Sequence, residues 1–451
     1  MNTRIKLLLF VISYTLFVSC AFSQEESISL TLEEAVNIAI ENNTNLNKAK
    51  IDEQIVQAQI AEVKGRALPQ ISGSGQFSDN FSLATQQLPG EFFGGEPGTT
   101  VDVAFGNRYN LTAGVNVQQQ LLDFQLFNSV RAAKALETLQ ELQTLQTTED
   151  LIINVVQVYI QIQVTEKQIQ LLQENYNRTN SLVELSDAKY EEGIIRKLDL
   201  NQLIVNRSNL NTQIEDVRFT RNEQVRLLNL YLNIPISTSV TLTEKLEDRA
   251  PYPIEEGLNV ASNIQFQQME QQLDLALLDE KQVKSRYLPT LSAYFNYNYQ
   301  GNSNELTVSS PDYQDQWNGN WGLTASIPIF DGFQRSKQLQ QKQLTTKKLE
   351  EDKINLNNSI QKAYEDAKEQ LLLSNTQIES QQSNMELAKE NYAGIKLSYN
   401  EGVADLTELL DAEFALQQAQ SNYLNALLQS KVAELTLLKA NGQLSKLITQ
   451  N

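Results

Sequence analysis

The same series of motifs occurs twice along the chain, and this duplication constrains the fold more than any other feature. The pairs, in chain order, are 66–72 with 286–292, 121–123 with 329–331, and 190–193 with 399–402. Only the interval between the first and second motifs differs in length, and it is longer in the first copy. Self-similarity of this kind indicates that one structural unit has been duplicated and fused, with one loop of variable length.

The motif spacing predicts the organisation of the chain. Proline residues concentrate between the two copies, which indicates a connecting segment. The predicted parts are a signal peptide at 1–23, a first repeat at 24–233, a linker at 234–258, a second repeat at 259–445 and a tail at 446–451.

The first 23 residues have the pattern of a secretory signal. Arg4 and Lys6 precede an apolar run, and Ala21-Phe22-Ser23 is a small-x-small cleavage site. Cleavage after Ser23 removes Cys20, the single cysteine, so the mature chain has no disulfide. In an alternative interpretation Cys20 is a lipidated first residue, because Val18-Ser19-Cys20 resembles the end of a lipoprotein signal. Either way the protein is expected to leave the cytoplasm.

Composition excludes several classes of function. The net charge of −19 argues against nucleic acid as a partner, since phosphate binding needs clusters of Lys and Arg. The chain has no histidine, which excludes Ser-His and Cys-His nucleophilic pairs and His-ligated metal sites. We predict no catalytic residue, no cofactor and no metal site. Beyond the signal there is no apolar run of about 18 residues, so any membrane crossing is expected to use strands.

Four segments alternate between apolar and polar residues with a period of two, which is typical of strands. They lie near 71–77, 109–118, 290–299 and 321–329. Each has about ten residues, the length of a tilted membrane strand. They are expected to form two hairpins, at about 70–120 and about 290–330. The connecting loops, roughly 79–108 and 301–319, are rich in Gly, Asn and Ser and are predicted to be irregular and exposed.

The remaining sequence predicts very long helices. Neither Gly nor Pro occurs between Val115 and Glu192 or between Phe333 and Ala393. Small and apolar residues recur at three-four spacing after Gly402, for example Leu409, Ala412 and Leu416, which predicts a coiled-coil seam. Near the start of the mature chain, Thr31-Leu32-Glu33-Glu34 fits a capping box.

Each repeat is predicted to contain one long helical hairpin with a glycine at its tip. Gly193 and Gly402 are suited to the left-handed conformation that ends a helix. About six residues later, Asp199 and Glu408 place a carboxylate in the first turn of the next helix. The tips are therefore expected near 193–199 and 402–408.

The strands also predict oligomerisation. A hairpin in lipid has unpaired backbone edges that only a closed sheet can satisfy. Four strands are too few to enclose a pore, because about eight make the smallest filled barrel. Two copies supply eight strands and three supply twelve, and strand counting leaves both open.

The order, duplication and spacing of these motifs resemble the TolC-type outer-membrane efflux family over about residues 30–445. The shared features are the opening 30–35 with Asn42-Asn43, the Leu-Pro at each helix-to-strand junction, 328–332, and the two glycine tips. The resemblance implies a mainly α protein with a membrane β-barrel: long α-helical hairpins plus four transmembrane strands per protomer, in a homotrimer with a twelve-stranded barrel. It also implies a porin-like outer-membrane channel whose helical part lies in the periplasm. Such a channel exports substrates with a periplasmic adaptor and an inner-membrane pump, in tripartite efflux or type I secretion.

Two acidic residues match the family positions that ring the periplasmic entrance, Glu408 and Asp411. They lie three residues apart and off the Leu409/Ala412 seam, so they share a helical face. In a trimer they would form two rings of carboxylates that favour cations. The alternative is that both are solvated carboxylates at a helix start.

The resemblance also matches Tyr399 and Asp199 to residues that bridge neighbouring tips in closed members of the family. Here Ala404 occupies the position of the family's assisting arginine, and Arg196 is the available substitute. Packing alone is the alternative role for Tyr399, because it continues a seven-residue series with Met385 and Tyr392.

A different class of function remains as an alternative, namely a periplasmic coiled-coil protein with a purely structural role. It accounts for the long helices but not for the four alternating strands. Drug efflux, metal efflux and protein secretion share this type of conduit, so the sequence leaves the exported substrate open.

Overall fold

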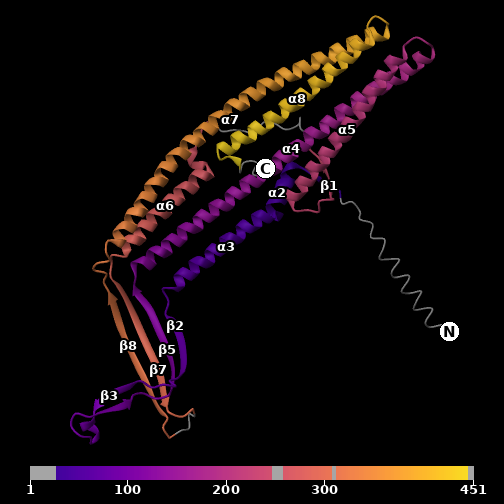
Figure 1. Ribbon diagram of the computed structural model, residues 1–451. Coiled ribbons are helices and arrows are strands. Elements are labelled where there is room, and N and C mark those ends of the chain that lie inside the picture. Colours follow the sequence, from indigo (N-terminus) through magenta and orange to yellow (C-terminus); the bar gives the residue numbers. More distant parts are fainter. Residues whose placement is uncertain (1–26, 246–256, 307–310, 445–451) are drawn as a thin grey trace, which may run out of the picture. The chain divides into compact units, whose positions relative to one another are not determined.

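The computed structural model describes residues 27–245, 257–306 and 311–444 (Figure 1). The predicted signal peptide, Cys20 and the predicted tail lie outside these residues. The chain forms two compact units, and each unit takes segments from both halves of the sequence. One unit consists of residues 53–140 and 270–351 and contains the strands of the hairpins. The other consists of the described residues up to 52, 141–269 and from 352 onward, and contains the ends of the helical hairpins.

A four-stranded antiparallel sheet dominates the strand unit. Its strands are β2 (Gln70–Asp79), β5 (Tyr109–Leu122), β7 (Thr290–Ser303) and β8 (Gln314–Ser326), in the order β2-β5-β7-β8. The β2–β5 and β7–β8 pairs are the two predicted hairpins. Pairing of β5 with β7 joins the first repeat to the second, which the sequence pattern did not specify.

Register keeps the two faces of this sheet chemically distinct. Val117, Phe295 and Trp321 are direct cross-strand neighbours, and so are Asn116, Asn296 and Asn320. Odd-numbered residues therefore form the face rich in apolar and aromatic side chains, and even-numbered residues form the polar face.

The predicted limits of the fourth strand are wrong. The strand begins at Gln314 and ends at Ser326, because backbone pairing with β7 continues to Asn302. Residues 314–320 are mostly polar or glycine, so they carry little apolar alternation for a sequence pattern to detect. Pro328, which lacks a backbone N–H, lies beyond the end of the strand.

The first connecting loop is more regular than predicted. Within 79–108 the chain forms β3 (Thr85–Pro89), the 3-10 helix η1 (Gly90–Phe93) and β4 (Thr100–Ala104), and β3 pairs with β4 in antiparallel fashion. Val101 and Val103 give β4 its strand preference. The prediction that the whole loop is irregular was wrong, because the glycines at 90, 94, 95 and 98 form only the turn between two short strands.

Helices account for most of the remaining chain. They are α2 (Leu32–Asn42), α3 (Thr44–Gly65), α4 (Phe124–Glu191), α5 (Lys197–Leu232), α6 (Ile264–Ser285), α7 (Gln334–Asn400) and α8 (Leu406–Ala440). The 68 residues of α4 rise about 100 Å along the helix axis. Among the described residues, none of the helices combines the length and apolar character needed to cross a bilayer.

A parallel strand pair lies beside the main core of the helical unit. β1 (Ser27–Leu30) pairs with β6 (Ser239–Leu242), so the predicted linker contributes a strand. The Tyr159 hydroxyl, fully buried, donates to the Leu30 carbonyl at 3.1 Å. At the start of α2, Thr31 and Glu34 form the predicted capping box.

The predicted coiled-coil seam forms between the helical hairpins. Leu409, Ala412 and Leu416 of α8 are buried in one cluster with Leu182 and Leu200. This cluster places the ends of α4, α5, α7 and α8 side by side, and each hairpin turns just beyond it (Figure 1).

Candidate functional site

Both helical tips use the same backbone turn. Gly193 has φ 76° and Gly402 has φ 79°, a left-handed conformation that costs other residues free energy. The amide of the next residue then bonds back to the helix, from Ile194 to the Lys189 carbonyl and from Val403 to the Ser398 carbonyl, both at 2.9 Å. Each turn thereby satisfies carbonyls at its helix end that would otherwise lack partners.

The α7–α8 tip exposes its carboxylates. Asp405 caps α8, since its side chain accepts a hydrogen bond from the Glu408 backbone amide at 2.8 Å. Glu408 and Asp411 are both exposed, while Leu409 and Ala412 are buried. The two carboxylates are therefore available to ions or to other chains, on the side of α8 that the seam leaves free.

Asp199 at the α4–α5 tip has a partner in its own chain. The guanidinium of Arg196 lies 2.8 Å from the Asp199 carboxylate. This hydrogen-bonded pair holds the pKa of Asp199 below its usual value, with burial opposing the shift. Arg196 thus engages Asp199 within the same tip.

Tyr399 is partly buried against the seam cluster. The ammonium of Lys189 lies 5.4 Å from the centroid of its ring, within the range of a cation–π interaction. Among the described residues, Tyr399 and Asp199 share no hydrogen bond. The structure therefore brings Tyr399 to the α4 helix end and Asp199 to Arg196, in separate contacts.

A buried polar cluster lies behind the tips, and the sequence pattern did not reveal it. Glu413 is only 1% exposed, and one of its carboxylate oxygens accepts from the Thr179 hydroxyl at 2.8 Å. Burial raises the pKa of Glu413, while the hydrogen bond from Thr179 and the charges of Arg178 and Lys396 oppose the shift. The other carboxylate oxygen has no hydrogen-bond partner among the described residues. Glu413 is next in sequence to the seam residue Ala412, and this position was the feature of the sequence that could have indicated its burial.

The polar face of the sheet carries a row of amides. Asn116 donates to Asn296, and Asn296 donates to Asn320 at 3.0 Å. On the opposite face Trp321 is 79% exposed and Phe295 is 45% exposed. Exposed aromatic groups on one face and amides on the other are the arrangement expected of a sheet with lipid on one side and water on the other.

No cluster of His, Cys, Asp or Glu suited to a metal ion occurs within 27–245, 257–306 and 311–444. The carboxylates of the tips lie along exposed helix turns rather than converging on one point. The described residues therefore offer two separate candidate features, the polar face of the sheet and the exposed carboxylates of the tips.

Comparisons with known proteins agree on one family. The sequence model of the outer membrane efflux protein family matches residues 35–233 and 259–443. The alkaline protease secretion protein AprF of Pseudomonas aeruginosa is 20% identical over 408 residues, covering 88% of this chain and 81% of AprF. The cation efflux system protein CusC of Escherichia coli O157:H7 is 20% identical over 419 residues, covering 90% of this chain and 85% of CusC.

Solved structures show the same fold. A crystal structure of CusC aligns with a TM-score of 0.73 at 18% identity and covers 91% of each chain. The outer membrane protein VceC of Vibrio cholerae aligns with a TM-score of 0.70 at 13% identity, covering 91% of this chain and 96% of VceC. The family match extends over both repeats and includes both tips and all four strands of the open sheet. The chain therefore belongs to the outer membrane efflux protein family, whose members are channel-forming transport proteins.

Proposed function

We propose that three copies of the chain close their sheets into one twelve-stranded barrel in the outer membrane. The observation that carries this proposal is the open sheet β2-β5-β7-β8, with one polar and one aromatic-rich face. Within the described residues β2 and β8 each pair on one side only. In lipid those free edges need partners, and the β8 edge of one copy is complementary to the β2 edge of the next.

The proposed trimer works as the outer component of a tripartite efflux or type I secretion system. The long helices α4 and α7 extend the conduit into the periplasm, where a periplasmic adaptor and an inner-membrane pump engage it. The relatives support both types of export, since AprF is named for protease secretion and CusC for cation efflux. The polar face of the sheet lines the water-filled passage.

Adjacent substitutions on opposite faces of β5 test the barrel. Ala113→Arg places a charge on the odd-numbered face, and Thr112→Arg places the same charge on the even-numbered face. A charge facing lipid near the bilayer midplane costs roughly 2–4 kcal/mol per copy, whereas one in the lumen faces water. We expect Ala113→Arg to abolish detergent-extracted trimers, and Thr112→Arg to leave trimers with altered conductance in planar bilayers.

Equal tolerance of the two arginines, or a folded monomer that stays in solution without detergent, would contradict the barrel. The second result would instead support the structural coiled-coil alternative. Native mass of the wild-type protein decides whether the assembly contains two copies or three.

We further propose that Glu408 and Asp411 form the acidic entrance of the channel. Their exposure on one side of α8, beside the buried Leu409 and Ala412, supports this role. Replacing both by Ala is expected to weaken the block of single-channel current by a multivalent cation such as La³⁺ at least tenfold, because charge in a narrow entrance concentrates cations. The matched control is Glu191→Ala with Glu192→Ala, which removes two exposed charges from the other tip. Identical block in all three proteins would reject this assignment.

Tip closure is the third element of the proposal. Tyr399 and Asp199 would bridge neighbouring tips, and Arg196, already paired with Asp199, would take the place of the family's assisting arginine. The combination of Tyr399→Phe and Asp199→Ala is expected to raise the closed-state conductance. Conductance that stays at the wild-type closed level would leave Tyr399 with a packing role only.

A further inference from the structure

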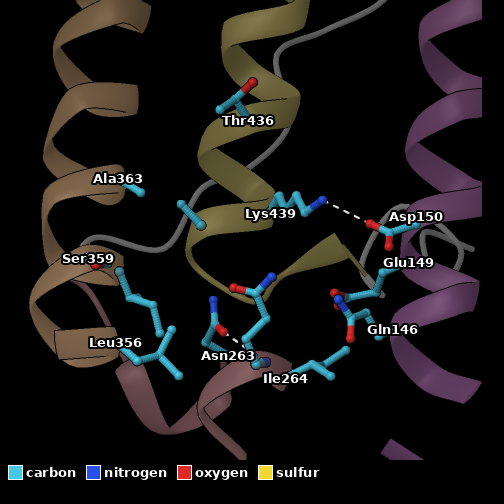
Figure 2. Close-up of a pocket in the computed structure, with 13 residues that line it drawn as sticks. Gln146, Glu149, Asp150, Asn263, Ile264, Leu356, Ser359, Ala363, Thr436 and Lys439 are labelled. Atoms are coloured by element: carbon cyan, nitrogen blue, oxygen red, sulfur yellow. Dashed lines mark hydrogen bonds and ion pairs between the residues drawn. The ribbon is translucent and has the colours of Figure 1, made fainter. Parts of the chain in front are cut away.

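A pocket of about 310 Å³ lies in the helical unit, and neither the channel nor the tips account for it (Figure 2). Four helical segments surround it: residues 146–150 of α4, the start of α6, residues 356–363 of α7 and the end of α8. All of these segments belong to the same compact unit. The volume is at the lower end of the range found for small-molecule sites.

The two sides of the pocket differ in chemistry. Leu356 and Ala363 of α7 lie on one side, and Glu149 and Asp150 of α4 lie on the other (Figure 2). Ile360 is a further lining residue from α7 and is buried. The pocket therefore presents apolar surface opposite a pair of carboxylates.

Charge in the pocket is unbalanced. Lys439 is the single basic lining residue, and its ammonium pairs with Asp150 at 2.9 Å. Glu149 has no hydrogen bond or ion pair with any described residue. Burial raises the pKa of Glu149 to about 7, with Asp150 adding to the shift and Lys439 opposing it. A half-buried carboxyl group in a cleft, with no ion pair of its own, is a candidate binding group.

The start of α6 also lines the pocket, but its capped backbone amides are not free to bind an anion. The Asn263 side chain accepts hydrogen bonds from the backbone amides of Gln265 at 3.0 Å and Phe266 at 3.3 Å. The first turn of the helix is thereby capped by the protein itself. The remaining lining residues of α7 are uncharged.

We propose that this pocket binds a small organic cation with an apolar body, and that Glu149 is its counter-ion. The ammonium group replaces the missing cation at Glu149, and the apolar body covers Leu356, Ile360 and Ala363. The proposal does not depend on channel activity, because binding is measured on the purified protein.

Three probes that share the same apolar group but differ in charge test the role of the ammonium group. They are 4-phenylbutylamine, the neutral 4-phenylbutan-1-ol and the anionic 4-phenylbutyrate, measured by equilibrium dialysis against the full-length protein in detergent, with empty micelles as reference. The amine is expected to bind about tenfold more tightly than the alcohol, the scale of one charge-assisted hydrogen bond, and the butyrate least tightly. Equal binding of amine and alcohol would overturn the proposal.

Two variants identify the site. Glu149→Gln is expected to reduce amine binding to the level of the alcohol, whereas Glu141→Gln, at an exposed carboxylate of α4 outside the pocket, leaves it unchanged. Ala363→Phe fills the pocket from an exposed position and is expected to reduce binding of amine and alcohol alike. Amine binding that survives Glu149→Gln would overturn the assignment of the counter-ion.

The pH dependence gives an independent readout. Asp150 and Lys439 are the other titratable groups that line the pocket, and they already pair with each other. Amine affinity is expected to rise between about pH 6 and 8 as Glu149 ionises, while alcohol affinity stays constant. An amine affinity that does not change across this range, or that falls, would contradict the role of Glu149.

Discussion

At the α4–α5 tip, α5 begins without a side-chain cap and Arg196 pairs with Asp199, whereas at the α7–α8 tip Asp405 caps the helix and no base occurs within 399–411. The two tips nevertheless share the glycine conformation and the first hydrogen bond after it, and the second tip adds a bond from the Ala404 amide to the Ser398 carbonyl at 3.2 Å. The two repeats therefore share the turn, which positions the hairpin, and differ in the side chains that each tip exposes. Asp199 of the first tip is paired with Arg196, whereas Glu408 and Asp411 of the second tip have no ion-pair partner among the described residues.

The same asymmetry continues below the tips. When the two tip glycines are aligned, Glu413 corresponds to Ile204 and Thr179 corresponds to Ala388. Glu413 is buried with Thr179, while Ile204 is 38% exposed. The second hairpin thus carries a polar contact to the first that has no duplicate.

Among substitutions that test this difference between the hairpins, Thr179→Val is expected to change the local stability most. The substitution keeps the shape of the side chain but removes the donor to buried Glu413, which costs roughly 1–3 kcal/mol. Hydrogen exchange of the amides around 175–183 and 409–417 measures the change in local opening free energy. Thr212→Val, at an exposed threonine of α5, is the control and should change it little. Equal effects would mean that the contact with Glu413 carries no special stability.

The pH dependence of the same cluster follows from the raised pKa of Glu413. Stability from the protonated group is fully present below the ordinary glutamate pKa of 4.5, and it is lost as the pH rises through the folded-state pKa. The charges of Arg178 and Lys396 oppose the rise of the Glu413 pKa, and Glu413 in turn raises the pKa of the neighbouring Tyr392. Glu413→Gln is therefore expected to flatten the pH profile of local exchange stability, and an unchanged profile would count against this explanation.

The next largest effect is expected at the shared turn. Gly193→Ala and Gly402→Ala each place a side chain in the left-handed region, at a cost of about 1–2 kcal/mol. An added Cβ meets no atom within 4 Å at either glycine, so the cost is conformational and should be nearly equal at the two tips. Exchange rates of the amides that close each turn provide the measurement. A clear difference between the two glycines would show that the tips are not equivalent in backbone.

The smallest effect is expected at the starts of α5 and α8, the second helix of each hairpin, which are stabilised in different ways. Asp405→Ala removes an N-cap and is expected to destabilise the first turn of α8 by about 1 kcal/mol. Arg196→Ala removes a solvent-exposed ion pair and should produce a smaller change at the start of α5. Fraying of each helix start, followed by amide exchange at Glu408 and Asp199, compares them directly. A larger destabilisation from Arg196→Ala than from Asp405→Ala would mean that the ion pair stabilises its helix start more than the N-cap does.

The sequence predicted the parts of this fold that depend on local pattern. Period-two alternation located the paired strands, and the absence of Gly and Pro located α4 and α7. Pairing between distant segments was not predictable, because β5 with β7 and β1 with β6 depend on which edges meet in space. The β3–β4 hairpin was missed because its strands are too short to show a period.

The candidate site was predictable to a similar extent. The positions of the tips followed from Gly193 and Gly402, whereas the roles of Glu408, Asp411, Tyr399 and Asp199 came from the resemblance and remain proposals. Glu413 and Glu149 were not predicted, because a buried carboxylate on a helix looks like any other glutamate until its neighbours are known.

The parallel pairing of β1 with β6 also has a consequence for biogenesis. Ser29 and Thr241, which bond across this pair at 2.9 Å, are separated by 212 positions in the chain. Pairing across such a long sequence separation is intrinsically slow, because it must overcome the entropy of closing a long loop. Strand β1 therefore lacks its partner strand until the chain has been made through Leu242.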